Sequence, residues 1–597
     1  MSHRQTDLLD SLSAELSQQL EDHTDKVLLE IIRPNFASQF AQGAPELVGF
    51  RKAIAQSDSK DDVDFLRSFR EFIPITNYEP YRPFIAKFLA IPCMEADVKN
   101  MFAPGLPYFL AMTSMTTRNA PKLFPKYRPP PHLLQQLSYQ GFGPSEGVTL
   151  APSSLRHWQV LRIDCEDGQS SKEVAVCSMS IGILRMAMNW DIEHDKDRLD
   201  LWVPGKTDPY AISLVKHYRT LFILNALFAL ADRRVTTIRF LFANVFVIFL
   251  QYVEDEWRLL VECIEKGIIP DVEDLGDLRA PLERHLTPNP VRAAELREIG
   301  PPVIQGWAVR VWPDLKQFVG ITGGQAAVSV PKARQGWKVT HLLGPSVTIK
   351  SHGYGTAECG LARVYHRGNP NTDFKVAFRD GVVEFLDVRS DEPSGRVLSA
   401  WELVTGGNYE PVVTTHNGLW RYHIADVITV KGFAPDDGLP VINYLHRRDD
   451  SLGVAFGASC TESQLTNAIV SAAQQSIGQI VAFTIVLDDR DKPVTYGYLV
   501  ELAGELSPCL LQRQDARMAT KHIFESLISA SDDYRLVVWQ GKSRRPTIRI
   551  MDKGTFAEYH RQKCEQTNIM VGQVKVPVVI FDPAMKEWFL ERVVMEL

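Results

Sequence analysis

The stretch AMTSMTTRNAPKLFP, at residues 111–125, concentrates hydroxyl side chains and a lysine in one short segment. Its polar residues include Thr113, Ser114, Thr116, Thr117 and Lys122. A solvated turn is the simpler explanation of this composition. A cradle for a polyphosphate is the more specific one, because hydroxyls and an ammonium group can neutralise phosphate charge. The second explanation requires other segments to supply the rest of a nucleotide site.

Other segments carry residue types that suit such a site. SHGYGTAECG places Tyr354 and Glu358 in a Y-x-x-x-E frame, with Gly355 and Thr356 between them. GLWRYHIADV ends in the frame Y-R-x-G-D, whose aspartate is Asp426. Two further basic positions follow, Arg447 in HRRDDSLGVAFGASCTE and Lys575 in GQVKVP.

The common phosphate and nucleophile motifs are absent. GKS at residues 541–543 would need glycine at position 536 for a P-loop, and that position is Leu536. No G-x-G-x-x-G occurs. GPSEG around Ser145 matches the G-x-S-x-G elbow in letters only, because an elbow needs a strand before it and a helix after it. The flanking HLLQQLSYQ and VTLAPSS predict the reverse order.

Taken together and in order, the segments resemble the acyl-adenylate-forming superfamily. TSMTTRNAPK has the hydroxyl and lysine order of the phosphate loop S-S-G-T-[ST]-x-G-x-x-K. Within the superfamily the sequence is similar to the Gretchen-Hagen family of acyl-acid amido synthetases, the plant auxin- and jasmonate-conjugating enzymes. This similarity also rests on EFIPITNYEPYRPFI, WPDLKQFVGITGG, VVTTHNGLWRYHIADVITVKGF and MDKGTFAEY, and the matching segments span residues 70 to 577.

The resemblance implies a ligase that uses ATP and Mg²⁺ to adenylate a carboxylic acid. The acyl group would then pass to an acceptor amine, for which an amino acid is expected. Two anions, the carboxylate and the α-phosphate, must approach each other in the first step, so the site must neutralise charge. Transfer to coenzyme A or to another thiol or alcohol remains an alternative. A catalytically inactive homologue that binds an acyl acid or a nucleotide remains another.

The resemblance also implies a role for each candidate residue. Thr113, Ser114, Thr116, Thr117 and Lys122 would bind the β- and γ-phosphates. Glu358 would hold Mg²⁺, a hard cation that takes carboxylate and phosphate oxygens. Asp426 would accept hydrogen bonds from both ribose hydroxyls, since a carboxylate only accepts. Tyr354, Gly355 and Thr356 would lie against the adenine side of the nucleotide, and Arg447 would contact ribose or phosphate. Lys575 would reach the α-phosphate and the carboxylate during adenylation.

The sequence departs from the family pattern at a few positions. Met115 and Asn119 stand where the phosphate loop favours glycine, which approaches phosphate closely and tolerates positive φ. Met115 is the sharper departure because its side chain would crowd the pyrophosphate. Ala425 replaces the glycine before Asp426, and His423 takes the arginine position. The charged positions are kept, which favours activity.

The elements that must position these residues predict an α/β protein of two domains. With 597 residues the chain exceeds one ordinary core. Helical spacing dominates residues 5–70 and 213–267, and short β-type runs follow from about residue 300. From residue 447 the pattern becomes strand–helix–strand on a smaller scale, with YRLVVWQ expected to be a strand. We therefore expect a large adenylation domain at residues 1–446, with mixed sheets and helical layers, and a small mobile α+β domain at residues 447–597.

Composition restricts the class of protein further. The net charge of −7 argues against a general nucleic-acid binder, and the basic run KSRRPTIR predicts a solvated face. The eight cysteines form no C-x-x-C pair. The apolar run at residues 240–253 falls short of the roughly 20 residues that cross a bilayer, and predicts a buried helix. We expect a cytoplasmic monomer without membrane or nucleic-acid partners.

Overall fold

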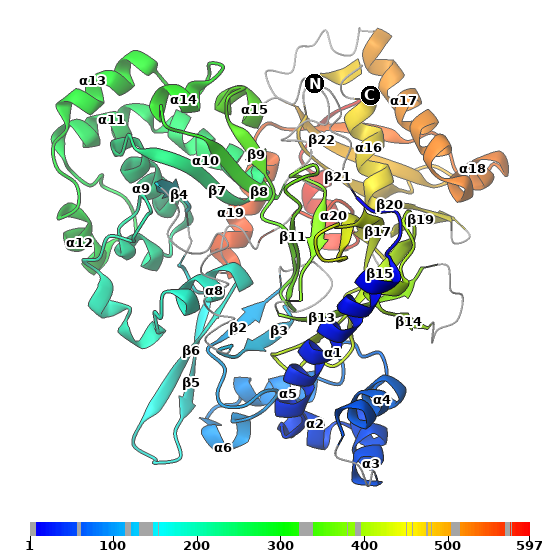
Figure 1. The fold of residues 1–597 in the computed structure, drawn as a ribbon. Coiled ribbons are helices and arrows are strands. Elements are labelled where there is room, and N and C mark those ends of the chain that lie inside the picture. The colour runs from blue at the N-terminus through cyan, green and yellow to red at the C-terminus, as the bar shows by residue number, and fades with distance from the viewer. Residues whose placement is uncertain are drawn as a thin grey trace.

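The polypeptide begins with helices, as their spacing predicts. In the computed structural model, α1 (Ala14–Phe36) starts where the Ser13 side chain accepts a hydrogen bond of 3.2 Å from the Leu16 amide. Its buried residues recur at helical spacing and include Leu20, Leu28 and Ile31. Figure 1 shows α1 lying across the strands of the central sheet, and it contacts β13 (Gly381–Asp387) and β15 (Asn408–Thr415).

The structure describes residues 8–56, 61–113, 121–129, 147–152, 155–321, 338–378, 380–388, 396–448, 451–455, 458–472, 476–478, 480–502, 514–567, 574 and 576–597.

Shorter helices complete this N-terminal layer. They are α2 (Gln39–Gly43), α3 (Val48–Gln56), α4 (Asp62–Phe72), α5 (Arg82–Ala86) and α6 (Glu95–Val98). The aromatic side chains between them are buried and pack edge to face, for example Phe50 against Phe65 at 5.3 Å.

The hydroxyl-rich segment lies in a hairpin of a mixed five-stranded sheet. The strand order is β1 (Cys93–Met94), β5 (Gln159–Asp164), β6 (Ser171–Cys177), β2 (Phe109–Met112), β3 (Leu123–Lys126). Antiparallel pairing of β2 with β3 brings Met112 opposite Leu123. Thr113 and Lys122, which flank the two paired strands, are therefore adjacent.

A parallel four-stranded sheet lies in a helical layer. Its order is β4 (Val148–Leu150), β7 (Val235–Phe242), β8 (Gln317–Ile321), β9 (Thr348–Lys350). Parallel strands need crossover connections, and helices provide them here. The helices of this layer are α9 (Tyr218–Ala231), α10 (Ala243–Asp255), α11 (Trp257–Lys266), α12 (Arg279–Glu283), α13 (Pro290–Ile299), α14 (Trp307–Val311) and α15 (Lys338–Leu343). Helix α8 (Met179–Ala187) instead contacts β2 and β6 of the five-stranded sheet.

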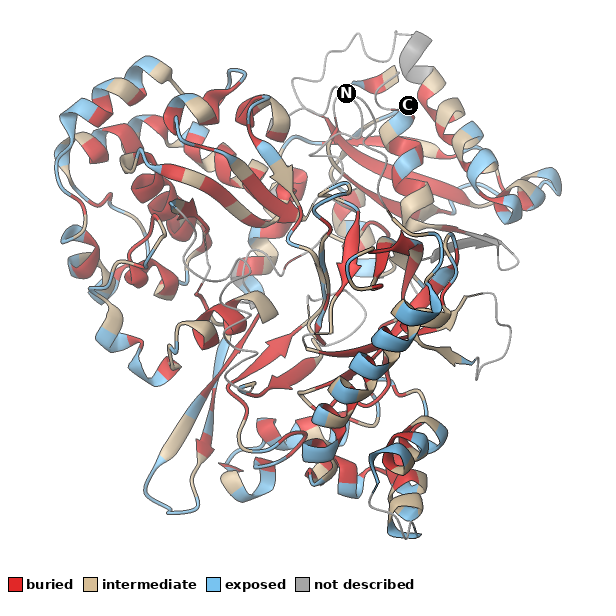
Figure 2. Ribbon diagram, in the orientation of Figure 1, coloured by how far each residue is buried: buried red, intermediate tan, exposed pale blue. Residues whose placement is uncertain are grey.

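A third, antiparallel sheet carries most of the other candidate residues. Its order is β10 (Tyr354–Gly355), β11 (Gly360–Val364), β12 (Phe374–Val376), β18 (Pro440–Arg447), β17 (Asp426–Phe433), β15, β13, β14 (Val397–Leu398), and β16 (Tyr422–His423) pairs with β15. The three sheets share one hydrophobic core with the N-terminal helices. Figure 2 shows the inner strands almost wholly buried.

The C-terminal part has cores of its own. The hairpin β19 (Ser451–Ala455) and β20 (Ala458–Thr461) precedes a sheet of order β21 (Ile480–Asp488), β22 (Thr495–Leu502), β23 (Thr547–Met551), β24 (Val593–Glu596). Its helices are α16 (Glu462–Ala472), α17 (Gln514–Ala530), α18 (Asp532–Trp539), α19 (Thr555–Thr567) and α20 (Pro583–Leu590). Two apolar clusters built from residues beyond 459 pack around this sheet. The predicted fold class, mixed sheets with helices and an α+β C-terminal domain, is confirmed.

One prediction of secondary structure is wrong and another is only partly right. YRLVVWQ forms most of α18, because Ser531 caps the helix through the Tyr534 amide and two aspartates occupy its first turn. The run at residues 240–253 contains the end of strand β7 as well as helix α10. A buried central strand is apolar on both faces, so its periodicity merges with that of the helix that follows. No helix in the described ranges has both the length and the hydropathy to cross a membrane.

Candidate functional site

Three candidate residues from separate strands meet at one carboxylate. Asp426 begins β17 and lies opposite Arg447, the last residue of β18. Nη1 of Arg447 is 4.0 Å from Oδ1 of Asp426, and the Tyr354 hydroxyl donates a hydrogen bond of 2.7 Å to Oδ2. Burial and the charge of Asp426 raise the pKa of Tyr354, so the phenol stays protonated as the donor. The structure thus brings Tyr354, Asp426 and Arg447 together.

The segment before Asp426 is fixed by buried polar contacts. The Arg421 guanidinium forms two hydrogen bonds with the Glu384 carboxylate, at 3.0 and 2.8 Å. It also donates to the main-chain oxygens of Arg70 and Ile73. Thr76 pairs with the backbone on both sides of Tyr422, since its amide donates to the Arg421 oxygen and its oxygen accepts from the His423 amide. These hydrogen bonds therefore fix the backbone that precedes Asp426.

The residue before Asp426 adopts a backbone conformation that favours glycine. Ala425 has φ +62°, in the left-handed region, which costs an L-residue about 1 kcal/mol or more. The amide of Arg448 donates to the Ala425 oxygen at 2.9 Å and holds this turn. The positive φ at this position explains why the Y-R-x-G-D frame has a glycine there. Ala425 adopts the same conformation with a loss of stability.

Glu358 lies in the turn that joins β10 to β11. The Thr356 amide donates to the Cys359 oxygen at 2.9 Å and closes this turn. Glu358 is only 6% exposed, and its carboxylate has no hydrogen-bond or ion-pair partner among the described residues. Burial and the negative charge of Glu358 raise the pKa of Tyr422, so this carboxylate faces the segment that leads to Asp426.

The ends of the hydroxyl-rich loop lie near the same segment. The Thr113 amide donates to the Lys122 oxygen, and the Thr113 hydroxyl accepts from the Lys122 amide, both at 3.0 Å. The Lys122 ammonium lies 5.4 Å from the ring centre of Tyr78. The Tyr78 ring packs on Phe124, which packs on Tyr422, with centroid distances of 5.5 and 5.8 Å. Ser114, Met115, Thr116, Thr117 and Asn119 lie outside the described residues.

Lys575 also lies outside the described residues, and its neighbour Val574 is described. The Val574 oxygen accepts a hydrogen bond of 3.0 Å from Nε2 of His560 on α19.

The chain that carries this site resembles known proteins. Family models match three consecutive parts of the sequence: the GH3 family N-terminal domain over residues 13–338, the central domain over 375–447 and the C-terminal domain over 463–584. The chain belongs to the GH3 family. The resemblance seen in the motifs is confirmed.

Curated GH3 relatives are distant in sequence. A putative indole-3-acetic acid-amido synthetase GH3.9 of Arabidopsis thaliana is 26% identical over 335 residues, 53% of this chain and 54% of that protein. The indole-3-acetic acid-amido synthetase GH3.15 of the same plant is 23% identical over 525 residues, 83% of this chain and 80% of that protein. The jasmonoyl-L-amino acid synthetase JAR4 of Nicotiana attenuata is 27% identical over 282 residues, 45% and 47% of the two chains. The first and third matches thus span about half of the relative.

A solved GH3 structure matches nearly the whole fold. The GH3.15 acyl acid amido synthetase aligns over 98% of this chain and 96% of that chain, with a TM-score of 0.73 and 21% identity. The complex of that enzyme with 2,4-DB aligns with a TM-score of 0.74. This GH3 chain therefore has the GH3 amido-synthetase fold from end to end.

Sequence reasoning missed a buried lysine beside the Glu358 turn. Lys126 is 2% exposed, and its ammonium donates to the main-chain oxygen of Glu358. Burial lowers its pKa. Lys126 ends the strand that leaves the hydroxyl-rich loop, so it ties that hairpin to the turn of Glu358. A lysine among apolar strand residues was the available signal.

A second missed group surrounds Glu410, which is 1% exposed. His423 and Arg448 both contact its carboxylate. The sequence assigned no role to His423. The structure places it with Arg448 at the Glu410 carboxylate.

Cys359 is buried beside Glu358, and burial raises its pKa, which is the opposite of what a nucleophilic thiolate needs. Within the described parts of the chain, no three His, Cys, Asp or Glu side chains form a metal cluster. A single carboxylate is consistent with a cation that takes its other ligands from a substrate.

A polar cavity of about 400 Å³ lies apart from these residues. Tyr108, Arg128, Lys172, Arg185 and Asp191 are among its lining side chains. It opens at the start of β2, whereas the hydroxyl-rich loop follows the end of that strand. None of the candidate site residues lines it.

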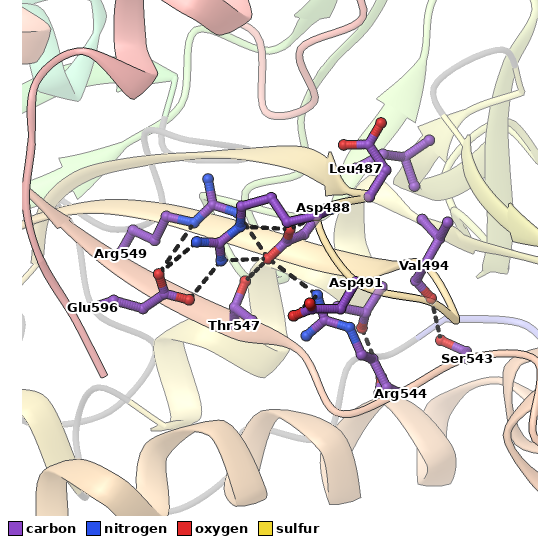
Figure 3. Close-up of polar contacts among 12 residues, drawn as sticks. Leu487, Asp488, Asp491, Val494, Ser543, Arg544, Thr547, Arg549 and Glu596 are labelled. Atoms are coloured by element: carbon purple, nitrogen blue, oxygen red, sulfur yellow. Dashed lines mark hydrogen bonds and ion pairs between the residues drawn. The ribbon is translucent and has the colours of Figure 1, made fainter.

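The basic run KSRRPTIR is not a solvated face. Arg549 is 4% exposed, and its guanidinium lies 2.7 Å from the buried Asp488 carboxylate. Figure 3 shows Arg544 and Thr547 also reaching Asp488, while Glu596 pairs with Arg549. The run therefore contributes Arg544, Thr547 and Arg549 to an ion cluster that joins β21, β23 and β24, while Arg545 stays exposed. The prediction fails at Arg549 because β23 pairs with a strand on each side, which buries this side chain.

Proposed function

We propose that this GH3 protein is an ATP-dependent ligase that adenylates a carboxylic acid and transfers the acyl group to an amine. The expected amine is that of an amino acid, because its relatives are named indole-3-acetic acid-amido synthetase and jasmonoyl-L-amino acid synthetase. The observation that carries the proposal is the convergence of Tyr354 and Arg447 on Asp426, with the Glu358 turn and the base of the hydroxyl-rich loop close by.

The Asp426 group suits the nucleoside end of ATP. Asp426 would accept hydrogen bonds from the ribose hydroxyls, with Arg447 beside it for ribose or phosphate. Tyr354, Gly355 and Thr356 would border the adenine. Thr113, Ser114, Thr116, Thr117 and Lys122 would neutralise the β- and γ-phosphates, because hydroxyls and a cation stabilise charge that moves onto the leaving pyrophosphate.

Glu358 fits a magnesium ion. Among the described residues the nearly buried Glu358 carboxylate makes no hydrogen bond or ion pair, and burying a charge is costly unless a cation compensates it. Mg²⁺ binds through one or two carboxylates together with substrate phosphates and water, so one carboxylate beside a triphosphate is enough. When bound, the ion would neutralise phosphate charge during attack by the substrate carboxylate.

The C-terminal domain would complete the site. In this proposal the large domain covers residues 1–446 and the small one residues 447–597, and a hinge near Asp449 re-aims the small domain between the two half-reactions. Lys575 would bring its charge to the α-phosphate and the substrate carboxylate in the first half-reaction. An amine would approach after the domain has moved.

Pyrophosphate release tests the proposal. The full chain is incubated with ATP, Mg²⁺ and a panel of aromatic and hydrophobic acids, including indole-3-acetic acid and jasmonic acid, with hydroxylamine as a general acceptor. Hydroxamate formation with pyrophosphate release is expected for at least one acid. Thermal stabilisation by ATP or an acid, without pyrophosphate from any of them, would instead identify a binding protein.

The acceptor is tested separately. Hydroxylamine is replaced by the twenty amino acids or by coenzyme A, and the products are weighed by mass spectrometry. We expect amides of one or a few amino acids. A thioester in place of an amide would assign the alternative transfer.

A further inference from the structure

A buried histidine joins the C-terminal domain to the large domain. Helix α19 of the C-terminal domain contacts α9 of the large domain, and Figure 1 shows α19 beside the helical layer. His560 on α19 and Tyr218 on α9 are each 3% exposed. The burial of both side chains means that the two domains, in this arrangement, exclude water from the contact.

The two ring nitrogens of His560 face different partners. Nε2 lies 3.0 Å from the Val574 oxygen, whereas Nδ1 lies 3.4 Å from the Tyr218 hydroxyl and 3.8 Å from the Cys564 sulfur of the same helix. A carbonyl oxygen only accepts hydrogen bonds, so Nε2 carries the proton and Nδ1 is left to accept from Tyr218. One imidazole thus connects a large-domain helix to the main chain next to Lys575.

The chain on the other side of Lys575 is fixed as well. The Ile485 amide donates to the Val578 oxygen at 2.7 Å, and the Ile580 amide donates to the Ile485 oxygen at 2.8 Å. Thr484 donates to the Pro577 oxygen at 2.7 Å. The segment 577–580 therefore runs along β21 of the C-terminal domain, while the Val574 side chain packs into the core cluster of the large domain.

We propose that His560 is a positioning residue that holds the backbone at Val574 against the large domain for the adenylation half-reaction. This inference rests on the proposed function, in which Lys575 acts in that half-reaction. Rotation of the C-terminal domain would separate His560 from Tyr218, so the contact belongs to one of the two domain arrangements. Transfer of the acyl group, which follows the rotation, does not depend on it.

Two substitutions separate the two hydrogen bonds. The amide of asparagine reaches about as far as Nδ1, so His560→Asn keeps a group facing Tyr218 and loses the donor to Val574. Glutamine reaches about as far as Nε2, so His560→Gln keeps an N–H donor to Val574. His522→Asn is the matched control, because His522 lies on α17 of the same domain and its Nδ1 pairs with Ser476 at 2.9 Å.

The catalytic test measures the half-reactions separately, with an acid that the wild type accepts. ATP–pyrophosphate exchange reports adenylation, and amide formation from a synthetic acyl-adenylate reports transfer. For His560→Asn we expect kcat of exchange to fall at least about tenfold with little change in KM for ATP, since a small misplacement of a reacting group is enough for such a loss. The rate of amide formation from the acyl-adenylate should stay within about twofold of the wild-type rate. His560→Gln keeps the donor to Val574 and loses the Tyr218 partner, so its kcat of exchange should fall by less than that of His560→Asn, and His522→Asn should stay near the wild type.

A second readout does not depend on activity. Trypsin cleavage after Lys575 is followed by mass spectrometry in the full chain, and we expect it to be faster in His560→Asn than in His560→Gln. If His560→Asn does not fold, Tyr218→Phe removes the large-domain partner and should give the same split between the half-reactions. Wild-type exchange and cleavage in these variants, or equal loss of both half-reactions, overturns the inference. Absence of exchange in the wild type with every acid overturns the proposed function instead, and the cleavage rates then decide whether His560 holds the segment.

Discussion

The hydroxyl of Tyr354 donates a 2.7 Å hydrogen bond to Asp426 although three strands separate β10 from β17 in their sheet. Four strand spacings across a flat sheet would amount to about 19 Å. The sheet must therefore curl so that its β10 edge approaches β17. Tyr444 on β18 lies between these strands in the sheet order, and its ring centre is 5.8 Å from that of Tyr354.

Replacing Asp426 tests the centre of this arrangement. Asp426→Ala should lower ATP–pyrophosphate exchange at least about a hundredfold, because it removes the carboxylate on which the ribose and Arg447 depend. Tyr354→Phe removes one donor and leaves the carboxylate, so a smaller loss of about tenfold, mainly in KM for ATP, is expected. Steady-state kinetics over a range of ATP concentrations separates the two. An Asp426→Ala enzyme with the wild-type rate would remove this residue from the mechanism.

Glu358 is tested through its cation. Glu358→Ala should lower adenylation at least about a hundredfold, because Mg²⁺ loses its protein ligand. Glu358→Gln keeps the size of the side chain and should raise the Mg²⁺ concentration needed for half-maximal exchange. Asp380→Asn, which changes a nearby carboxylate that accepts from the Gly360 amide at 2.7 Å, should leave the Mg²⁺ requirement unchanged. If the wild type, Glu358→Gln and Asp380→Asn all need the same Mg²⁺ concentration for half-maximal exchange, this assignment is contradicted.

Ala425 offers a test of stability. Its φ of +62° strains an alanine, so Ala425→Gly should raise the free energy of unfolding by up to about 1 kcal/mol. Ala53→Gly in the interior of α3 should change it by about the same amount in the opposite direction, because glycine is a poor helix former. Urea unfolding of the two variants measures both. A destabilised Ala425→Gly would show that the turn depends on the methyl group.

The Asp488 cluster gives a prediction with a pH dependence. Burial alone would raise the pKa of Asp488, but hydrogen bonds from Arg490, Thr547 and Arg549 outweigh it and hold this pKa far below its usual value. The ionised carboxylate therefore stabilises the fold fully above its unfolded pKa of about 4, and this contribution is lost as the pH falls below that value. Asp488→Asn should cost about 3 kcal/mol at pH 7, because it leaves buried arginines uncompensated.

The pH series supplies the control for this prediction. The stability difference between the wild type and Asp488→Asn should shrink as the pH is lowered from about 5 towards 3. Asp491→Asn, whose side chain is 79% exposed beside Arg544, should change stability by less than about 0.5 kcal/mol at every pH. A difference that does not vary with pH would mean that packing, and not charge, makes Asp488 important.

Met115 tests the alignment of the loop. Met115→Gly restores the residue that the phosphate-loop pattern favours, so unchanged or faster exchange is expected. Ala111→Gly, on the buried strand β2 before the loop, is the control for a general effect of glycine and should lower stability. A large loss of exchange in Met115→Gly alone would show that this loop is aligned wrongly.

The sequence predicted the family and the fold class, whereas the roles of the candidate site residues stay predictions. Asp426, Tyr354 and Glu358 stand out because polar residues occur there in short frames that match the family pattern. The strand expected at Tyr534 to Trp539 is a helix, because a serine cap and two aspartates outweigh β-branched propensity there. Lys126, Glu410 and His560 could not be assigned from sequence, since each acquires its role from a partner that only the fold brings close, namely Glu358, Arg448 and Tyr218.

The hydrogen bonds of Arg421 to the carbonyls of Arg70 and Ile73 have a consequence for protein engineering. The N-terminal eighty residues contain no ligand-binding candidate, yet they support the backbone from which Asp426 projects. A shortened chain that starts beyond them would retain every candidate residue and lose their alignment. Chimeras between GH3 proteins should therefore inherit residues 70–76 and 421–426 from the same parent.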